Sequence, residues 1–362
     1  MSFKKSKIIV AAALVLCVLL SGCGYNPESV GTINGEDIPC GRWLYYQFNA
    51  LHTLAGEYND AHPDDQLSSY LDLLSKTDDD GTSYTELLRE ETLKACKRYV
   101  FVESEFDRLG LEITEDEQSS NENTALSIWN YYGQTIYESN GVGYDTFLQL
   151  YENGIKDSMV MSALYGEGGE REITLEEREE YFYNNFMAAE YFTLPSTVED
   201  EEGSTQNISD LYPDELDALA QEMVETAKQS GLRAAYLSHY AEALALAGDT
   251  ETAVDSDAAD SAIHTGTYSE VLGYNTDMTD AVAAIEEDDY GYALIGSTMY
   301  IFQRTALTSD AESDYDETVI SLLSEEPFEE YVTEQTASYE VTTDDKALNY
   351  YSAEKVDLSY LG

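Results

Sequence analysis

The sequence contains few basic residues. Lysine and arginine together number 18 in 362 residues, against 72 aspartate and glutamate residues, and the formal net charge at pH 7 is −54. A surface this acidic repels the phosphate backbone of nucleic acids and the headgroups of anionic lipids. We therefore expect no nucleic-acid partner and no membrane-binding face that acts through charge.

Cysteine and histidine are also scarce, with four residues of each. No two cysteines have the Cys-x-x-Cys spacing of metal or redox sites. The histidines lie at no ligand spacing from one another, and His239 has the position of an ordinary histidine on a helix face. We therefore expect no metal site and no cofactor. Cys40 and Cys96 leave two alternatives open, a disulfide outside the cell or a buried Cys96 thiol.

The common catalytic motifs are missing as well. The sequence has no Gly-x-Ser-x-Gly elbow, no phosphate-binding loop and no His-Glu-x-x-His. Residues 78–81 read Asp-Asp-Asp-Gly and begin like a calcium loop, but the twelfth loop position falls on Leu87 instead of a glutamate. The sequence therefore gives no support for nucleophilic or zinc-dependent hydrolysis.

Long apolar runs are missing except at the start of the chain. There, residues 8–20 form an apolar run that follows Lys4, Lys5 and Lys7 and leads into Leu-Ser-Gly-Cys at residues 20–23. This pattern is typical of a bacterial lipoprotein signal peptide over residues 1–22. We expect the lipid on Cys23 and a short tether over residues 23–29. The alternative is an uncleaved membrane anchor. In either case the bulk of the chain lies outside the cytoplasm, at the outer face of the cytoplasmic membrane.

The remaining composition is that of a folded protein. Apolar residues make up 43% of the chain and aromatic residues 12%, with 30 tyrosines, which excludes disorder throughout. Residues 39–187 show mainly helical periodicity. Thr114 with Glu117, and Thr174 with Glu177, form capping-box patterns, and Gly110 follows a long apolar-periodic stretch as a helix stop.

The pattern changes after residue 187. Residues 188–194 are strand-like, residues 214–230 and 232–246 are helical, and residues 290–304 read as a hairpin about Gly296 and Ser297. Residues 57–82 and 249–260 are polar and predict loops. The order of strand, helices and final hairpin predicts an α+β domain.

Four stretches in this order resemble extracytoplasmic foldase lipoproteins of the PrsA/SurA kind. They are Val-Gly-Thr-Ile-Asn-Gly-Glu at 30–36, Leu-Gly-Leu-Glu-Ile-Thr-Glu-Asp-Glu at 109–117, Ile-Thr-Leu-Glu-Glu at 173–177, and the helix and strand of 328–348. The resemblance implies an α+β fold with a mainly helical, SurA-N-like chaperone domain built from both ends of the chain, residues 30–187 and 311–362. It also implies an inserted, degenerate parvulin-like domain over residues 188–310. In such an arrangement the run 30–36 pairs with the strand near Val341.

The chain departs from the parvulin pattern at the catalytic positions. Parvulins carry a histidine in the first strand and another in the last, with a Gly-Gly-x-Leu-Gly turn between them. In this chain, Glu190 or Tyr191 of the first strand stands in place of the first histidine. Met299 or Tyr300 of the last strand stands in place of the second, and the turn motif is absent from the sequence. Isomerisation needs a pocket complementary to the twisted amide, because the barrier is about 18–20 kcal/mol. We therefore expect weak isomerase activity or none.

The predicted function is that of a lipid-anchored chaperone for unfolded or newly exported polypeptides. The expected client contacts are exposed apolar and aromatic side chains between the two domains, namely Phe192, Tyr292, Met299 and Phe302. A second candidate is the face of the helix over residues 145–165 that carries Met159 and Met161. An active prolyl isomerase is the alternative from the enzyme class. A solute-binding lipoprotein is disfavoured because residues 39–187 lack strand and helix alternation. The sequence does not exclude a homodimer.

Overall fold

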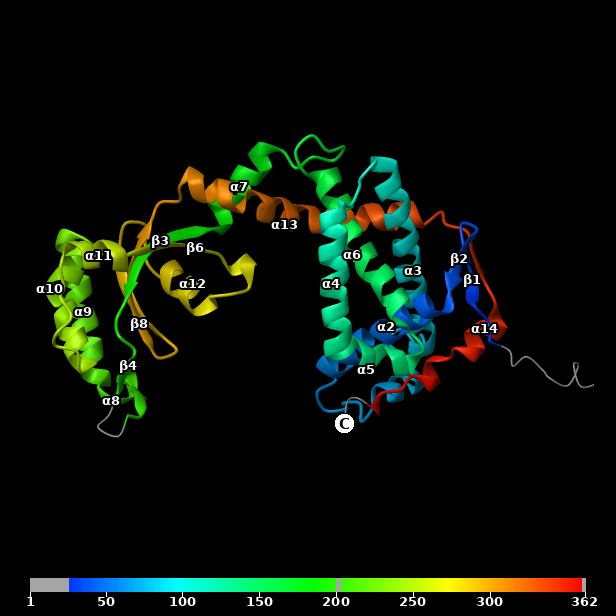
Figure 1. Cartoon of the computed structure of the whole chain (residues 1–362), viewed down its shortest axis with the longest axis horizontal. Helices are drawn as coiled ribbons and strands as arrows, with labels where there is room; N and C mark the ends of the chain where they lie inside the picture. The colour runs from blue at the N-terminus through cyan, green and yellow to red at the C-terminus, as the bar shows by residue number, and fades with distance from the viewer. Residues whose placement is uncertain (1–25, 200–202, 360–362) are drawn as a thin grey trace, which may run out of the picture. The chain divides into compact units, whose positions relative to one another are not determined.

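The computed structural model describes residues 26–199 and 203–359 (Figure 1). The expected signal peptide, the lipid site Cys23 and the first part of the tether lie outside the described residues. Among the helices that the structure describes, none is both long enough and apolar enough to cross a membrane.

The chain divides into two compact units. Unit 1 combines the two ends of the chain, up to Arg171 and from Ser324 onward, and unit 2 is the continuous stretch Glu172–Leu323. Unit 1 is mainly helical and unit 2 mixes helices with an antiparallel sheet, so the fold is α+β. The fold class expected from the sequence is confirmed.

Unit 1 is a helical body with one small sheet. Its helices are α2 (Cys40–Ala61), η1 (Tyr70–Ser75), α3 (Tyr84–Leu109), α4 (Glu115–Ile128), η2 (Trp129–Gly133), α5 (Gln134–Tyr137), η3 (Glu138–Asn140), α6 (Tyr144–Tyr165), α14 (Asp345–Tyr350), η5 (Ala353–Lys355) and the end of α13 (Ser309–Thr336). Capping residues and a glycine set the ends of several of these helices. The Ser83 side chain caps α3, Gly110 ends it in the left-handed conformation with φ 66°, and Thr114 and Glu117 form the expected capping box on α4.

The sheet of unit 1 joins the two ends of the chain. Its strands, in the order β2-β1-β9, are antiparallel: β1 (Ser29–Ile33), β2 (Glu36–Pro39) and β9 (Val341–Thr343). Gly31 lies opposite Thr343, and Ile33 lies opposite Val341. The predicted pairing of the opening strand with the strand near Val341 is confirmed. The turn from β1 to β2 consists of Asn34 and Gly35, both with positive φ.

The main core of unit 1 lies under this sheet. Val30, Ile33 and Trp43 pack with Cys96, whose side chain is fully buried. Burial raises the pKa of the Cys96 thiol to about 12. Cys40 and Cys96 are both free thiols, so the structure shows the buried-thiol alternative for Cys96.

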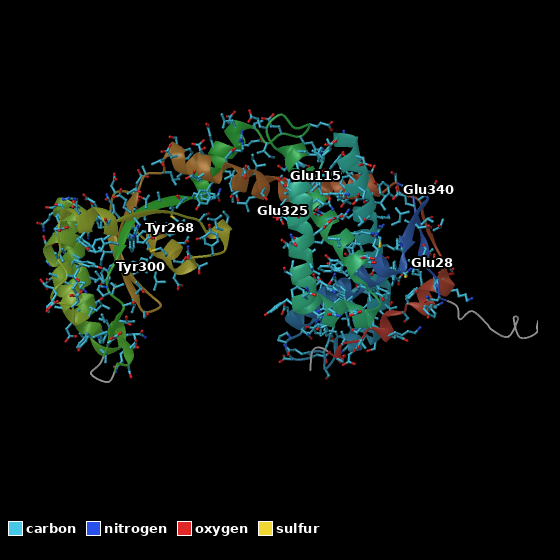
Figure 2. The ribbon with its side chains drawn as sticks, in the orientation of Figure 1. Glu28, Glu115, Tyr268, Tyr300, Glu325 and Glu340 are labelled. Atoms are coloured by element: carbon cyan, nitrogen blue, oxygen red, sulfur yellow. The ribbon has the colours of Figure 1, made fainter. Side chains whose placement is uncertain are left out.

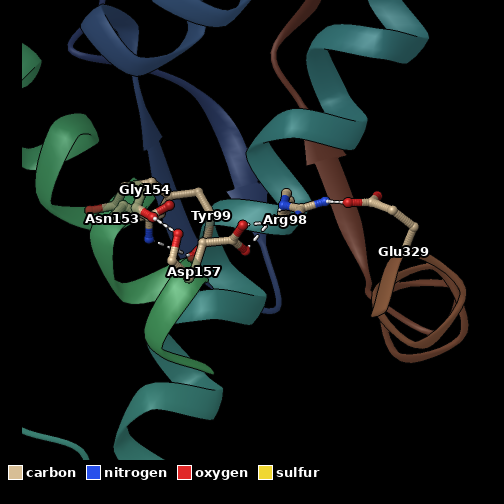
Figure 3. A network of polar contacts seen from close by, with 7 residues as sticks. Arg98, Tyr99, Asn153, Gly154, Asp157 and Glu329 are labelled. Atoms are coloured by element: carbon tan, nitrogen blue, oxygen red, sulfur yellow. Dashed lines mark hydrogen bonds and ion pairs between the residues drawn. The ribbon is translucent and has the colours of Figure 1, made fainter. Parts of the chain in front are cut away.

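A polar network fastens α3 to α6 and α13 within unit 1 (Figure 3). The guanidinium of Arg98 donates to both carboxylate oxygens of Asp157, at 3.1 and 2.8 Å, and also to Glu329. The Asn153 amide donates to the backbone oxygen of Tyr99 at 3.2 Å. Because Arg98 and Asp157 are partly buried, these bonds are screened less than those of exposed pairs.

Unit 2 is built on a four-stranded antiparallel sheet in the order β6-β3-β8-β7. Its strands are β3 (Met187–Thr193), β6 (His264–Tyr268), β7 (Tyr290–Ile295) and β8 (Thr298–Thr305), with a separate pair, β4 (Thr197–Glu199) and β5 (Thr205–Asn207). Its helices are α7 (Leu175–Asn185), α8 (Ile208–Leu211), α9 (Pro213–Ser230), α10 (Leu232–Leu246), α11 (Ser256–Ala262), η4 (Glu270–Leu272), α12 (Thr276–Ala283) and the start of α13. The expected β7–β8 hairpin about Gly296 and Ser297 is confirmed.

Both faces of this sheet are covered by helices. Helices α9 and α10 pack on one face and α12 packs on the other (Figure 1). Successive residues of a strand point to opposite faces. Thus Phe192 enters the core under α9 and α10, whereas Ala189 enters the core under α12.

The boundaries of the units differ from the expected 188 and 310. Helix α7 belongs to unit 2 because Phe182 and Phe186 pack against Val319 of α13, and Arg178 pairs with Asp316. The divisions therefore fall near residues 171 and 323. The loop expected over 57–82 is partly wrong, since α2 continues to Ala61 and η1 forms around the buried Leu73. The loop expected over 249–260 is also partly wrong, because α11 begins at Ser256.

Candidate functional site

A cleft of about 410 Å³ opens on the α12 face of the sheet in unit 2. We name it the tyrosine cleft, because three tyrosines from three different strands line it. They are Tyr191 of β3, Tyr268 of β6 and Tyr300 of β8. Figure 2 labels Tyr268 and Tyr300. The remaining lining residues are Asn275, Thr276, Asp277, Met278 and Ile295.

Strand register brings the tyrosines together. Tyr191 lies opposite Phe302, one pleat from Tyr300, and the rings of Tyr191 and Tyr300 are 5.7 Å apart at 45°. On the other side, Tyr191 lies opposite His264, and their rings are 5.8 Å apart. From the sequence, either Glu190 or Tyr191 could occupy the first parvulin histidine position, and either Met299 or Tyr300 the second. In the structure the tyrosines line the cleft and Met299 belongs to the core on the opposite face.

Tyr268 is the most deeply buried phenol of the cleft. Burial raises the pKa of Tyr268, and the neighbouring Tyr191 and Tyr300 raise it further. Tyr268 therefore stays neutral at physiological pH, as a hydrogen-bonding group and a ring surface. Asp277 is the one charged residue of the lining that the structure describes. The lining is mainly polar, and the cleft thus offers aromatic rings and hydrogen-bonding groups to a bound segment, without a paired acid and base among the described lining residues.

The predicted client-contact residues do not form one surface. Phe192, Met299 and Phe302 are at most 5% exposed and belong to the two cores of the sheet. Their burial argues against direct client contact at Phe192 and Phe302, whereas Met299 also lines the hollow that holds Tyr292. Helices cover both faces of the sheet, and these three side chains lie where the helices pack on the central strands β3 and β8.

Tyr292 lies in a different hollow, of about 480 Å³, between α9 and the β7–β8 hairpin. Its hydroxyl donates to the Asp217 carboxylate at 3.0 Å. Leu294, beside it, is 49% exposed. Tyr292 therefore stays a candidate contact, on the face of the sheet opposite the tyrosine cleft.

Unit 1 carries an apolar groove of its own along α6. Its lining is Leu111, Ile155, Ser158, Met159, Ser162 and Ala163, around about 500 Å³. The sequence suggested that Met159 and Met161 grip clients, and the structure places Met159 in this groove. We call it the α6 groove.

The sequence matches no protein-family model and none of the curated proteins. The structure is similar to the foldase protein PrsA from Lactococcus lactis, with 11% identity, a TM-score of 0.36, and coverage of 91% of this chain and 100% of that one. The chain resembles the PrsA foldases. PrsA from Streptococcus pneumoniae str. Canada MDR_19A is 15% identical, with a TM-score of 0.31 and 78% and 99% coverage. A peptidylprolyl isomerase PrsA from Bacillus anthracis is 11% identical, with a TM-score of 0.24 and 66% and 93% coverage.

The resemblance agrees with the one expected from the sequence. What the tyrosine cleft binds depends on the residues of this chain.

Sequence reasoning did not place His264 beside the cleft. Its neighbour Tyr191 is 73 positions away in the sequence, and strand pairing alone brings the two together. No local spacing signals such a contact.

Proposed function

We propose that the chain is a chaperone of the foldase type that binds unfolded, newly exported polypeptides. The observation that carries this proposal is the tyrosine cleft of unit 2, an open cleft with three aromatic side chains and no acid–base pair. Tyrosine offers a large rigid contact area at low cost in conformational entropy and can also form hydrogen bonds. Such a surface accepts many different side chains.

The α6 groove supports the proposal from unit 1. Methionine adapts to irregular partners, and Met159 lies in an open apolar groove instead of a closed core. Each surface is small and binds weakly by itself. An unfolded chain exposes many apolar segments, so it can bind both surfaces at once and gain avidity.

The acidity of the chain fits the same function. A formal charge of −54 keeps the protein soluble while it holds apolar segments, and it keeps the protein off anionic membranes. Surface charge therefore does not attach the chain to the membrane, and we propose that a lipid does. We propose Cys23 as its site, at the outer face of the bacterial cytoplasmic membrane.

An aggregation assay tests the chaperone function. The full chain, purified in mild detergent, should suppress the light scattering of a reduced, unfolded client at stoichiometric amounts. It should not bind the native form of the same client. An equally acidic protein with no aromatic cleft is the control for charge. No suppression beyond that control would contradict the proposal.

One observation favours prolyl isomerisation as a second candidate. Tyr191 and Tyr300 lie on the first and last strands, with their rings side by side in the cleft, where the resemblance to parvulins implies paired histidines. The rate of isomerisation of a proline-containing peptide decides between the two functions. A chaperone without catalysis predicts no acceleration above the rate without protein.

A further inference from the structure

Three ligand-type side chains gather on the outer surface of the α9–α10 helix pair, away from the tyrosine cleft. One oxygen or nitrogen atom from each of Glu222, His239 and Glu242 lies within 4.8 Å of the others. Glu222 is on α9, and the other two are on α10. Both glutamates are exposed, and the histidine is partly buried.

The helix geometry explains this arrangement. His239 and Glu242 are three residues apart, so they lie on the same face of α10. Glu222 and Thr226 are four residues apart on α9 and share the face that meets α10. The two helices are joined at Gly231, whose φ of 86° allows the chain to turn back.

The hydrogen bonding of His239 leaves one ring nitrogen available. Its Nε2 lies 2.9 Å from the hydroxyl oxygen of Thr226. Its Nδ1 is buried, makes no hydrogen bond, and lies 3.9 Å from a carboxylate oxygen of Glu242. We assign the Nε2 proton to a bond with Thr226. The Nδ1 lone pair then faces a carboxylate oxygen of Glu242, which has no proton to donate. A cation resolves this contact between acceptors.

We propose that Glu222, His239 and Glu242 bind a divalent transition-metal ion, for which Zn²⁺ fits best. One imidazole nitrogen and two carboxylate oxygens are donor types that Zn²⁺ accepts, and water would complete four-coordination. Two carboxylates balance the charge of the ion. The nitrogen disfavours Ca²⁺ and Mg²⁺, which prefer oxygen ligands alone.

The distances require only a small adjustment. Tetrahedral Zn²⁺ with bonds of about 2.0–2.1 Å places its ligand atoms about 3.3 Å apart. The side chain of Glu242 is 65% exposed, and Glu222 is also exposed, so both carboxylates can move inward without disturbing the core. Thr226 acts as a positioning residue, because its bond to Nε2 fixes the orientation and protonation of the ring. The bound ion would clamp α9 to α10.

Direct titration of the full chain with ZnCl₂ by calorimetry tests the site. We expect one tight Zn²⁺ per chain, above the weak binding that any acidic surface shows. His239→Ala should weaken that event by about 100-fold, and Glu222→Gln or Glu242→Gln should weaken it by about tenfold each. The matched controls are His62→Ala and Glu251→Gln, which remove a histidine and an exposed carboxylate elsewhere and should leave it unchanged.

Two further readouts separate a metal site from general cation binding. Thr226→Val should weaken Zn²⁺ binding by about tenfold, whereas Thr226→Ser should restore it. Zinc in excess should raise the Tm of unit 2 by about 5 °C. Trp43 and Trp129, the only tryptophans of the sequence, lie in unit 1, so their fluorescence transition should not move. Binding that is equal in wild type and Glu222→Gln, or equal for Ca²⁺ and Zn²⁺, would overturn the proposal.

Discussion

Replacement of Tyr191 and Tyr300 together by alanine is expected to weaken binding of an unfolded, proline-containing client peptide by about 100-fold, or about 3 kcal/mol. The two rings are 5.7 Å apart, lie side by side on neighbouring strands, and both line the tyrosine cleft. Their loss removes most of the aromatic contact area while the buried core residues stay in place. Fluorescence anisotropy of a labelled peptide gives the dissociation constant.

Two control variants show which property of the tyrosines matters. Tyr191→Phe with Tyr300→Phe keeps both rings, and its affinity should stay within about threefold of wild type. Tyr183→Ala removes an exposed tyrosine of α7 in the same unit and should have no effect on binding. An unchanged affinity in the double alanine variant would place client binding elsewhere. The same variants also test catalysis. If the rate of peptide isomerisation decreases when the two rings are removed, the result favours the isomerase function.

Gly31→Ala is expected to destabilise unit 1 by about 3 kcal/mol or more. A Cβ atom at this position would lie 2.0 Å from the backbone oxygen of Thr342 and 2.9 Å from the Cα of Thr343. The φ of 154° at Gly31 is also unfavourable for other residues. The strand pair must therefore separate, although it holds the two ends of the chain together.

Tryptophan fluorescence follows this loss selectively, because Trp43 and Trp129 are both buried in unit 1. The urea midpoint of that signal should fall by about 1 M. Gly154→Ala is the matched control, since it lies within α6 with open space around it and should be neutral or slightly stabilising. An unchanged midpoint in Gly31→Ala would mean that joining the two ends contributes little to the stability of unit 1.

The sequence predicted the features that depend on neighbouring residues. The capping boxes at Thr114 and Thr174 satisfy backbone groups within one helical turn, and Gly110 ends α3 through its own conformation. Asn34 and Gly35 set the first hairpin in the same local way. The pairing of β1 with β9 spans the whole chain, and it was predicted from the family resemblance and not from spacing.

Features that depend on tertiary packing were predicted less well. The alternating side-chain direction along β3 predicts that Tyr191 and Phe192 point to opposite faces of the sheet. It does not predict that helices cover both faces and bury Phe192. The division near residue 171 differs from the expected 188, because it depends on the packing of Phe182 against Val319, residues 137 positions apart. In the proposed metal site, His239 and Glu242 have a visible three-residue spacing, whereas Glu222 reaches them only through helix packing.

The central claim is that the tyrosine cleft binds unfolded polypeptide, and site-specific photocrosslinking tests it most directly. A photoreactive phenylalanine analogue would replace Tyr300 in the full chain, and Tyr183 in a control. We predict crosslinks from position 300 to a reduced, unfolded client and none to its native form, with none from position 183. No crosslink from position 300, or equal crosslinking from both positions, would contradict the claim.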